Sequence, residues 1–321
     1  MSSPKKICVI GGGSWGKNHI RTLNDLGSLS AVVDNSEAVI SKLNNIYPDC
    51  KFFKNVEDTF QYDYDGYIVA TPPSTHFQIA KKIVNIKKPL LVEKPITLNL
   101  NDALELNKLA KDKKVNLYVG HLLLFHPAYL KIKQMIEDNS IGEIEYIYSN
   151  RLNLGTIRKD ENVFWSFAPH DIALIQFFLK SFPSSISSDG SAIIRKNIHD
   201  STITCLKYDN GVMAHIFVSW LHPYKEHKFI IIGSKGMISF EDSLKDKPLI
   251  YYDKKVDWID GETIPHQGLS HNVTYDSTSA LENELIYFLD TLDKYPITKI
   301  NGDSAIEVIK ILEIATEDLI K

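Results

Sequence analysis

The sequence predicts an α/β protein of two domains, a doubly wound parallel sheet followed by an α+β domain with an open, mostly antiparallel sheet. Its 321 residues match the length of about two ordinary domains. Apolar runs typical of strands alternate with helical patterns over residues 1–120, and this alternation is typical of a parallel sheet. Over residues 121–321 short turns join several successive strands, which favours antiparallel pairing.

The composition is that of an ordinary globular protein, with 44% hydrophobic and 24% charged residues. The net charge is −4 and the basic residues are scattered, whereas a nucleic-acid-binding face needs clustered ones. No apolar run approaches the ~20 residues of a membrane-spanning helix, and the N-terminal residues show no secretory signal pattern. Cys8, Cys50 and Cys205 lack the spacing of metal ligands. We therefore expect a cytoplasmic protein with free thiols, no metal, and neither a membrane nor a nucleic-acid partner.

A glycine-rich motif, Gly11–Gly16, follows the first predicted strand, Lys6–Ile10, and precedes a helical pattern. Strand, G-x-G-x-x-G and helix form the arrangement that binds dinucleotides. Gly11 permits the tight turn, Gly13 lets the backbone approach a pyrophosphate, and Gly16 lets helix and strand pack closely. The pyrophosphate would lie on the N–H groups at the start of the helix. A purely structural turn is the alternative.

A second predicted strand, Leu29–Asp34, ends in an acidic residue eighteen positions after Gly16. A carboxylate there accepts hydrogen bonds from the adenosine ribose and repels a 2′-phosphate, so Asp34 favours NAD over NADP. Asn35 and Ser36 follow it, where an NADP site would favour an arginine. The alternative is an aspartate that only caps the helix beginning near Ser36.

The segment Pro89–Pro95 places a lysine where chemistry is expected. Its apolar residues, bounded by prolines, predict a buried parallel strand that ends in Glu93-Lys94-Pro95. In open α/β sheets ligands bind beyond the carboxyl ends of the strands, so Lys94 would lie at the ligand site. Another strand ends in Thr71 and two prolines, and Ser74 or Thr75 is expected to cap the helix after it.

The remaining pattern gives the other predicted elements. In the first domain they are helices near 37–46, 76–84 and 102–111 and strands near 52–53, 66–70 and 115–120. In the second they are helices near 128–137 and 170–180 and strands near 143–153, 201–208, 212–220, 228–233 and 237–240. Residues 253–278 are expected to form a long loop, and helices near 280–292 and 304–319 to pack back on the first domain.

These motifs resemble, in order and from end to end, those of the Gfo/Idh/MocA oxidoreductases. The matching segments are Gly11–Gly16, Ala70–Pro73 with His76, Glu93–Pro95, Gly120-His121, Pro169–Asp171, Gly233–Gly236 and Asn301–Asp303. The resemblance implies a Rossmann domain that binds NAD, with Lys94 near the nicotinamide and the reacting carbinol and Glu93 on the cofactor's ribose. Pro95 would fix Lys94, with a cis peptide bond as one possibility. The implied cofactor-binding residues are Gly11, Gly13, Ser14, Trp15, Gly16, Asp34, Thr71, Pro72, His76, Glu93 and Lys94.

The family's second catalytic element is an aspartate followed four residues later by a histidine. Here the histidine is His170, but Ser166 occupies the position of the acid, and Asp171 cannot replace it on the same helical face. Lys94 and His170 are therefore the candidate acid–base pair. A lysine, at ~10.4, needs a lowered pKa to act as a base, whereas a histidine begins at ~6.5. Which of them accepts the proton is left open.

A narrower likeness involves Val119–Pro127, Ser149–Gly155 and Asn162–Asp171, with Leu124 and His126 where many members of the family carry other residues. These segments resemble the branch that oxidises UDP-N-acetylglucosamine at its 3-hydroxyl. The resulting ketone receives an amine from an aminotransferase, giving 3-amino sugars for surface glycans or lipid A. The implied substrate-binding residues are His121, Arg151, Asn153, Arg158, Trp165 and His170. A homodimer or homotetramer on the open sheet is also implied.

Three alternatives to this activity stay open at the level of sequence. Two are enzymes: another sugar or cyclitol dehydrogenase, or a 3-ketosugar reductase that works in the opposite direction. The third is a non-catalytic regulator that responds to NAD.

Overall fold

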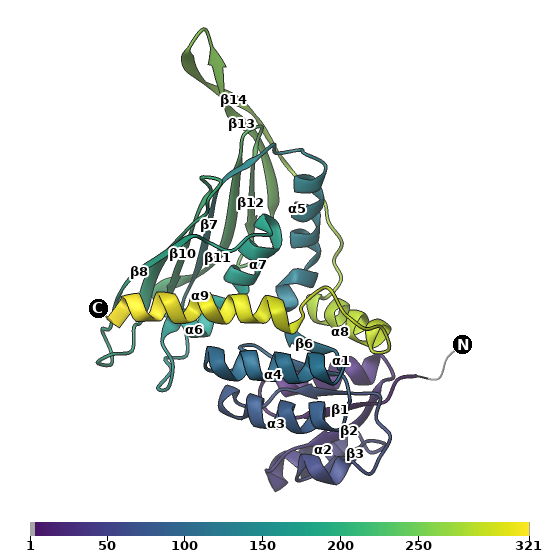
Figure 1. Cartoon of the computed structure of the whole chain (residues 1–321). Coiled ribbons are helices and arrows are strands. Elements are labelled where there is room, and N and C mark those ends of the chain that lie inside the picture. Colours follow the sequence, from purple (N-terminus) through teal and green to yellow (C-terminus); the bar gives the residue numbers. More distant parts are fainter. Residues whose placement is uncertain (1–3, 321) are drawn as a thin grey trace. The chain divides into compact units, whose positions relative to one another are not determined.

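The computed structural model describes residues 4–320, and the chain divides into two compact units (Figure 1). The first consists of residues 4–125 and 279–309, and the second of residues 126–278 and 310–320. Helix α8 (Ala280–Thr291) and the first part of α9 (Gly302–Ile320) therefore belong to the unit of the N-terminal sheet. No helix within residues 4–320 is long and apolar enough to cross a bilayer. The expected lack of a signal sequence depends partly on residues 1–3, which lie outside the described residues.

The first unit is built on six parallel strands in the order β3-β2-β1-β4-β5-β6. The strands are β1 (Ile7–Ile10), β2 (Leu29–Val33), β3 (Lys51–Phe53), β4 (Gly66–Val69), β5 (Leu90–Glu93) and β6 (Leu117–Gly120). The helices between them are α1 (Gly16–Asp25), α2 (Glu37–Ile46), η1 (Val56–Thr59), α3 (Pro73–Asn85) and α4 (Leu100–Asp112), with η2 (Leu122–Phe125) after β6. The strand order reverses between β1 and β4, which is where open α/β sheets bind their ligands.

The start of α3 differs from the prediction. The helix begins at Pro73, with Pro72 as its N-cap and no side chain capping it. Thr75 lies within the first turn, where its hydroxyl donates to the Pro72 carbonyl at 2.8 Å. The predicted cap by Ser74 or Thr75 is wrong because Pro73, with its fixed φ and no N–H, already suits the first helical position.

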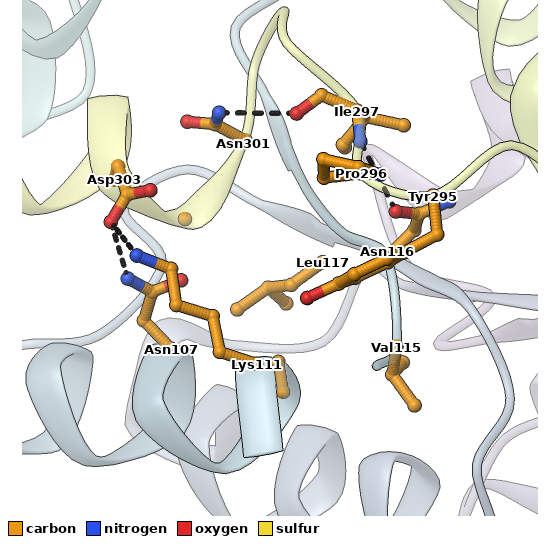
Figure 2. A pocket seen from close by; sticks show the side chains of 12 residues that line it. Asn107, Lys111, Val115, Asn116, Leu117, Tyr295, Pro296, Ile297, Asn301 and Asp303 are labelled. Atoms are coloured by element: carbon orange, nitrogen blue, oxygen red, sulfur yellow. Dashed lines mark hydrogen bonds and ion pairs between the residues drawn. The ribbon is translucent and has the colours of Figure 1, made fainter. Parts of the chain in front are cut away.

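The segment before α9 covers the outer strand of this sheet. The Val119 N–H donates to the Ile300 carbonyl at 2.8 Å, and Tyr118 and Asn301 form an antiparallel bridge. Figure 2 shows the pocket beside this seam, where Lys111 and Asn107 both bond Asp303, at 2.6 and 2.8 Å. These contacts protect the edge of β6.

The second unit is built on an eight-stranded sheet in the order β14-β13-β12-β11-β7-β10-β9-β8. Its strands are β7 (Ile144–Leu154), β8 (Ser185–Ser191), β9 (Ser201–Lys207), β10 (Met213–Ser219), β11 (Leu221–Gly233), β12 (Met237–Glu241), β13 (Leu249–Ile259) and β14 (Glu262–Asn272). Its other helices are α5 (Pro127–Glu137), α6 (Val163–Phe167) and α7 (Pro169–Leu179). Every pair is antiparallel except β7 with β10, so the prediction of a mostly antiparallel sheet is confirmed.

Aromatic residues hold helices α5 and α7 to one face of this sheet. Tyr129 of α5 packs edge-on against Phe229 and Phe240, and Phe178 of α7 contacts Phe229. Tyr148 and His215, neighbours on β7 and β10, stack on each other and stay half-exposed. One side of the sheet therefore provides the core of the unit.

The long loop expected over residues 253–278 is wrong. Strands β13 and β14 form a hairpin there, and Figure 1 shows it projecting past the other strands of its sheet. Asp260 and Gly261 both have positive φ, 51° and 86°, as a two-residue type I′ turn requires. The Asp-Gly pair was the available signal. It was masked because polar residues such as Lys254 and Lys255 make the strands poor in apolar alternation.

Candidate cofactor and catalytic site

The glycine-rich turn after β1 has the shape that a pyrophosphate needs. Gly11 has φ +97°, and a Cβ there would lie 2.6 Å from the Ala70 carbonyl oxygen. A Cβ on Gly16 would collide with the Gly11 carbonyl, whereas one on Gly13 would meet nothing within 4 Å. Gly13 and the exposed Ser14 thus leave open space at the start of α1, which fits a dinucleotide phosphate.

Asp34, at the end of β2, points its carboxylate at this turn. One oxygen accepts the Gly12 N–H at 2.8 Å and the other accepts the Ser36 N–H at 2.8 Å. The N-cap of α2 is Ser36, whose own hydroxyl accepts from Val39, so Asp34 does not replace it as the cap. Asp34 therefore ties the turn to α2 and stays half-exposed beside it.

Glu93 is the centre of the site in the first unit. Its Oε1 accepts from the Trp15 indole N–H and lies 2.6 Å from His19 Nε2, while its Oε2 accepts the Lys94 N–H at 3.1 Å. Burial alone would raise the pKa of Glu93, but the His19 bond and charge, with Trp15 and Lys94, hold that pKa below its usual value. A Cβ on Gly120 would lie 3.0 Å from Oε2, so this glycine makes room for the carboxylate.

The carboxylate predicted to hold the cofactor's ribose is thus bonded to the protein itself. His19 was missed by sequence reasoning, although it lies four residues after Trp15 and therefore on the same face of the chain as it enters α1. Glu93 joins the glycine-rich turn to the strand that carries Lys94. The ribose contact of Glu93 stays a prediction.

Lys94 follows β5 directly and is half-exposed, and its peptide bond to Pro95 is cis, the possibility raised from sequence. His76, fully buried, lies with Nδ1 2.9 Å from the Pro95 carbonyl and Nε2 2.8 Å from the Thr71 carbonyl. Burial lowers the pKa of His76, and a neutral ring donates from only one nitrogen at a time. His76 therefore lies between the Thr71 and Pro95 carbonyls and can donate to either of them, but to only one at a time.

His121 adds a neutral imidazole close to Lys94. The ring is 3% exposed, and burial together with the Lys94 charge lowers its pKa to about 4 against the opposing effect of Glu93. Within residues 4–320 its Nδ1 has no hydrogen-bond partner. An uncharged ring with a free nitrogen can bond a ligand without adding charge.

In the second unit, His170 is the second residue of α7, and Asp171 after it is buried. Arg151 of β7 forms a bidentate ion pair with Asp171. Its Nε donates to Oδ2 at 2.8 Å, and its Nη2 donates to Oδ1 at 3.0 Å. The Ser149 hydroxyl donates to Oδ1 at 2.6 Å. The guanidinium predicted to bind substrate thus faces Asp171 and fixes the start of α7 beside His170.

The other predicted substrate residues of this unit differ in availability. The Asn153 Oδ1 is buried, and no partner for it is found in the part of the chain that the structure describes. Arg158 is exposed and only loosely paired, with Nε 3.7 Å from Glu161. The Trp165 indole N–H donates to the Thr316 hydroxyl at 2.9 Å, so it already has a hydrogen-bond partner within the protein. Asn153 and Arg158 are therefore the polar groups best able to meet a ligand.

The structure brings Trp15, Glu93, Lys94 and His121 together in the first unit. His170, Arg151, Asn153, Arg158 and Trp165 belong to the second. The pairing of Lys94 with His170 stays a prediction of the resemblance. No group of three or more His, Cys, Asp or Glu within residues 4–320 could hold a metal ion.

Both units match models of one protein family. Residues 5–121 match the family model described as "Oxidoreductase family, NAD-binding Rossmann fold", and residues 129–239 match the "GFO/IDH/MocA C-terminal domain". The chain belongs to the Gfo/Idh/MocA oxidoreductase family. The predictions of a Rossmann domain, of NAD as cofactor and of oxidoreductase activity are confirmed with it.

Relatives of known name lie within this family. An inositol 2-dehydrogenase of Rhizobium meliloti is 24% identical over 97% of this chain and 96% of its own length. The UDP-N-acetylglucosamine 3-dehydrogenase of Acidithiobacillus ferrooxidans is 27% identical over 66% of each chain. A solved structure of that enzyme superimposes with a TM-score of 0.86 and 21% identity, covering 98% of this chain and 97% of that one. The structure of GenD2 from gentamicin A biosynthesis, solved in complex with NAD, superimposes with a TM-score of 0.82 and 18% identity. The match covers 100% of this chain and 95% of that one.

Proposed function

We propose that this protein oxidises the 3-hydroxyl of UDP-N-acetylglucosamine to a ketone and passes the hydride to NAD. The fixed position of Lys94 carries the proposal: Glu93, bonded to Trp15 and His19, holds it beside the glycine-rich turn. The similarity of sequence and fold to a UDP-N-acetylglucosamine 3-dehydrogenase supports the substrate. The product ketone would feed an aminotransferase in the synthesis of 3-amino sugars.

When bound, NAD would supply the acceptor for the hydride that leaves the sugar carbon. Gly13 and the N–H groups at the start of α1 would bind its pyrophosphate, and Asp34 its ribose hydroxyls. Lys94 would hold the substrate hydroxyl, and Lys94 or His170 would take its proton. The base must lie within hydrogen-bond reach and be unprotonated near neutral pH.

The nucleotide part of the substrate would meet polar groups of the second unit. Arg158 offers an exposed guanidinium fork, which suits a pyrophosphate, and Asn153 offers a buried acceptor that lacks a protein partner among the described residues. Arg151 would act indirectly, by holding Asp171 and hence the start of α7 with His170.

An absorbance assay of NADH formation tests this proposal. The purified chain is given NAD with UDP-N-acetylglucosamine, free N-acetylglucosamine or myo-inositol, and we expect a much higher kcat/KM with the UDP-sugar than with the other two. Lys94→Ala and His170→Asn should each lower kcat by about 10²-fold or more while NAD still binds. Near-normal turnover in either variant contradicts its assigned role.

The same assay separates the alternatives. Turnover of myo-inositol alone would favour a cyclitol dehydrogenase, for which the full-length similarity to an inositol 2-dehydrogenase speaks. NADH consumption with a 3-keto sugar, without the forward reaction, would indicate a reductase. Tight NAD binding with no turnover of any sugar would indicate a regulator.

We also propose a cytoplasmic homodimer or homotetramer that uses the half-exposed face of the second unit's sheet. That face carries Tyr146, Tyr148 and His215, whose rings pack on one another and leave aromatic surface accessible. Light scattering should give the mass of two or four chains. Tyr148→Glu should lower that mass, whereas a monomeric wild-type protein would exclude this interface.

A further inference from the structure

Glu284, in the middle of α8, is a carboxylic acid that the proposed chemistry does not use. The side chain is fully buried, and neither carboxyl oxygen has a hydrogen-bond partner within residues 4–320. An ionised carboxylate in such a place is strongly disfavoured, because it lacks both water and a counter-charge in contact. Glu284 therefore carries a proton in the free protein.

Several elements of the same unit pack on α8. Among them are α1, which contributes the buried His19, and η2, which carries no titratable side chain. Strand β6 contributes Tyr118, which packs edge-on against Tyr287 and Phe288 and lies with its hydroxyl 3.0 Å from that of Thr291. Asn283, next to Glu284, donates to the Phe125 carbonyl at 3.2 Å and so ties α8 to η2. These contacts place Glu284 in the buried interior of the first unit, which also contains Glu93.

Two charged groups act on Glu284 through this interior. Burial first, and then the Glu93 charge, raise the pKa of Glu284 well above its usual range, and Lys299 opposes them. Lys299 lies with Nζ 3.9 Å from the centre of the Phe125 ring, and burial lowers its pKa to about 8. Glu284 is thus electrostatically coupled to the carboxylate that holds Lys94.

The two buried acids are in opposite states. Glu93 is ionised and accepts hydrogen bonds from Trp15, His19 and the Lys94 backbone, while Glu284 has no such donors among the described residues. His19 and His121 each leave Nδ1 without a partner among them as well. A new charge nearby should strongly shift the pKa of buried polar groups that lack hydrogen-bond partners, because little water screens them.

We propose that Glu284 releases its proton when NAD⁺ binds beside Lys94 and regains one when NADH takes its place. This inference depends on the proposed function, since it needs the oxidised nicotinamide near Lys94. The oxidised ring carries a positive charge that the reduced ring lacks, and such a charge next to Glu93 favours ionisation of Glu284. The carboxylic acid becomes a carboxylate, and its proton passes to the solvent. The protein would thereby bind NAD⁺ more tightly than a variant in which an uncharged side chain replaces Glu284.

Binding calorimetry tests the proton release. NAD⁺ and NADH are titrated into the full chain across pH, in buffers of different ionisation enthalpy. If one proton is released, the affinity for NAD⁺ should rise by up to about tenfold for each unit by which the pH is raised. Glu284→Gln, which keeps the shape of the protonated acid, should remove that slope and leave NADH binding unchanged. Glu282→Gln, at an exposed position of the same helix, should behave as wild type.

Infrared difference spectra give a second readout that a merely structural role would not move. Adding NAD⁺ to the wild type should remove a protonated-carboxyl band, and the Glu284→Gln spectrum should lack this change. NAD⁺ binding with no proton release, or with the same release in Glu284→Gln, overturns this inference alone. A wild-type chain that binds no NAD⁺ overturns this inference together with the proposed cofactor site.

Discussion

His19 Nε2 lies 2.6 Å from Glu93 Oε1, and this contact joins the helix after the glycine-rich turn to the strand that carries Lys94. Both side chains are buried, so the contact is shielded from water. The same His19–Glu93 contact therefore helps to position both the glycine-rich turn and the segment that carries the proposed catalytic Lys94. A change in either residue should affect both.

Replacing His19 by leucine removes one partner of the buried Glu93 carboxylate while Trp15 and the Lys94 N–H remain. We expect a loss of about 1–3 kcal/mol in the free energy of unfolding. Urea denaturation measures it, with Asn24→Leu at an exposed position of α1 as the control. Equal stability of the two variants would mean that the contact contributes nothing.

Two glycines of the turn should separate folding from cofactor binding. Gly16→Ala forces a Cβ against the Gly11 carbonyl and should cost about 1–3 kcal/mol of stability. Gly13→Ala meets no protein atom within 4 Å, so it should fold normally. Its methyl group should weaken NAD binding by about tenfold or more, because it occupies the approach of the pyrophosphate. Unchanged NAD affinity in Gly13→Ala would contradict the assigned position of the phosphates.

Acid should destabilise the first unit through His121. Its pKa is about 4 in the folded chain and 6.5 in an exposed histidine, so the unfolded chain binds the proton more readily. The stabilisation is complete above pH 6.5 and is lost as the pH falls towards 4, by about 3 kcal/mol at most. Urea unfolding between these pH values should show a shallower loss in His121→Phe than in wild type. His271→Phe, an exposed site, serves as the control, and equal slopes in all three proteins would contradict the buried neutral ring.

The two arginines of the second unit should respond differently. Arg151→Ala leaves Asp171 buried without its partner and should cost about 3–5 kcal/mol of stability. Arg158→Ala should change stability by less than about 0.5 kcal/mol but raise KM far more for a UDP-sugar than for a free sugar. Thermal unfolding and steady-state kinetics measure both effects. A stable Arg151→Ala variant with a raised KM would return Arg151 to the substrate site.

The parallel sheet was predictable because its strands are short apolar runs that end in residues of the proposed site. The strand before Gly11 and the strand before Lys94 both have this form. The hairpin over β13 and β14 was not, because exposed strands carry polar residues and only Asp260-Gly261 marked the turn.

The sequence motifs were enough to predict which segments form the candidate site. They were not enough to predict which side chains contact one another there. His19 and Gly120 gain their roles only when α1, β5 and β6 meet around Glu93. The burial of Glu284 could have been predicted from the sequence, because it lies with Leu281, Leu285 and Phe288 on the buried face of α8. An acid at such a position is a signal that periodicity can reveal.

The proposed reaction transfers a hydride from the sugar's C3 carbon to NAD. The direct measurement uses UDP-N-acetylglucosamine that carries deuterium only at C3, with the reduced cofactor examined by NMR or mass spectrometry. We predict deuterium on the nicotinamide ring and slower turnover than with the unlabelled sugar, and no transfer with Lys94→Ala. Reduced cofactor that contains no deuterium would contradict oxidation at C3.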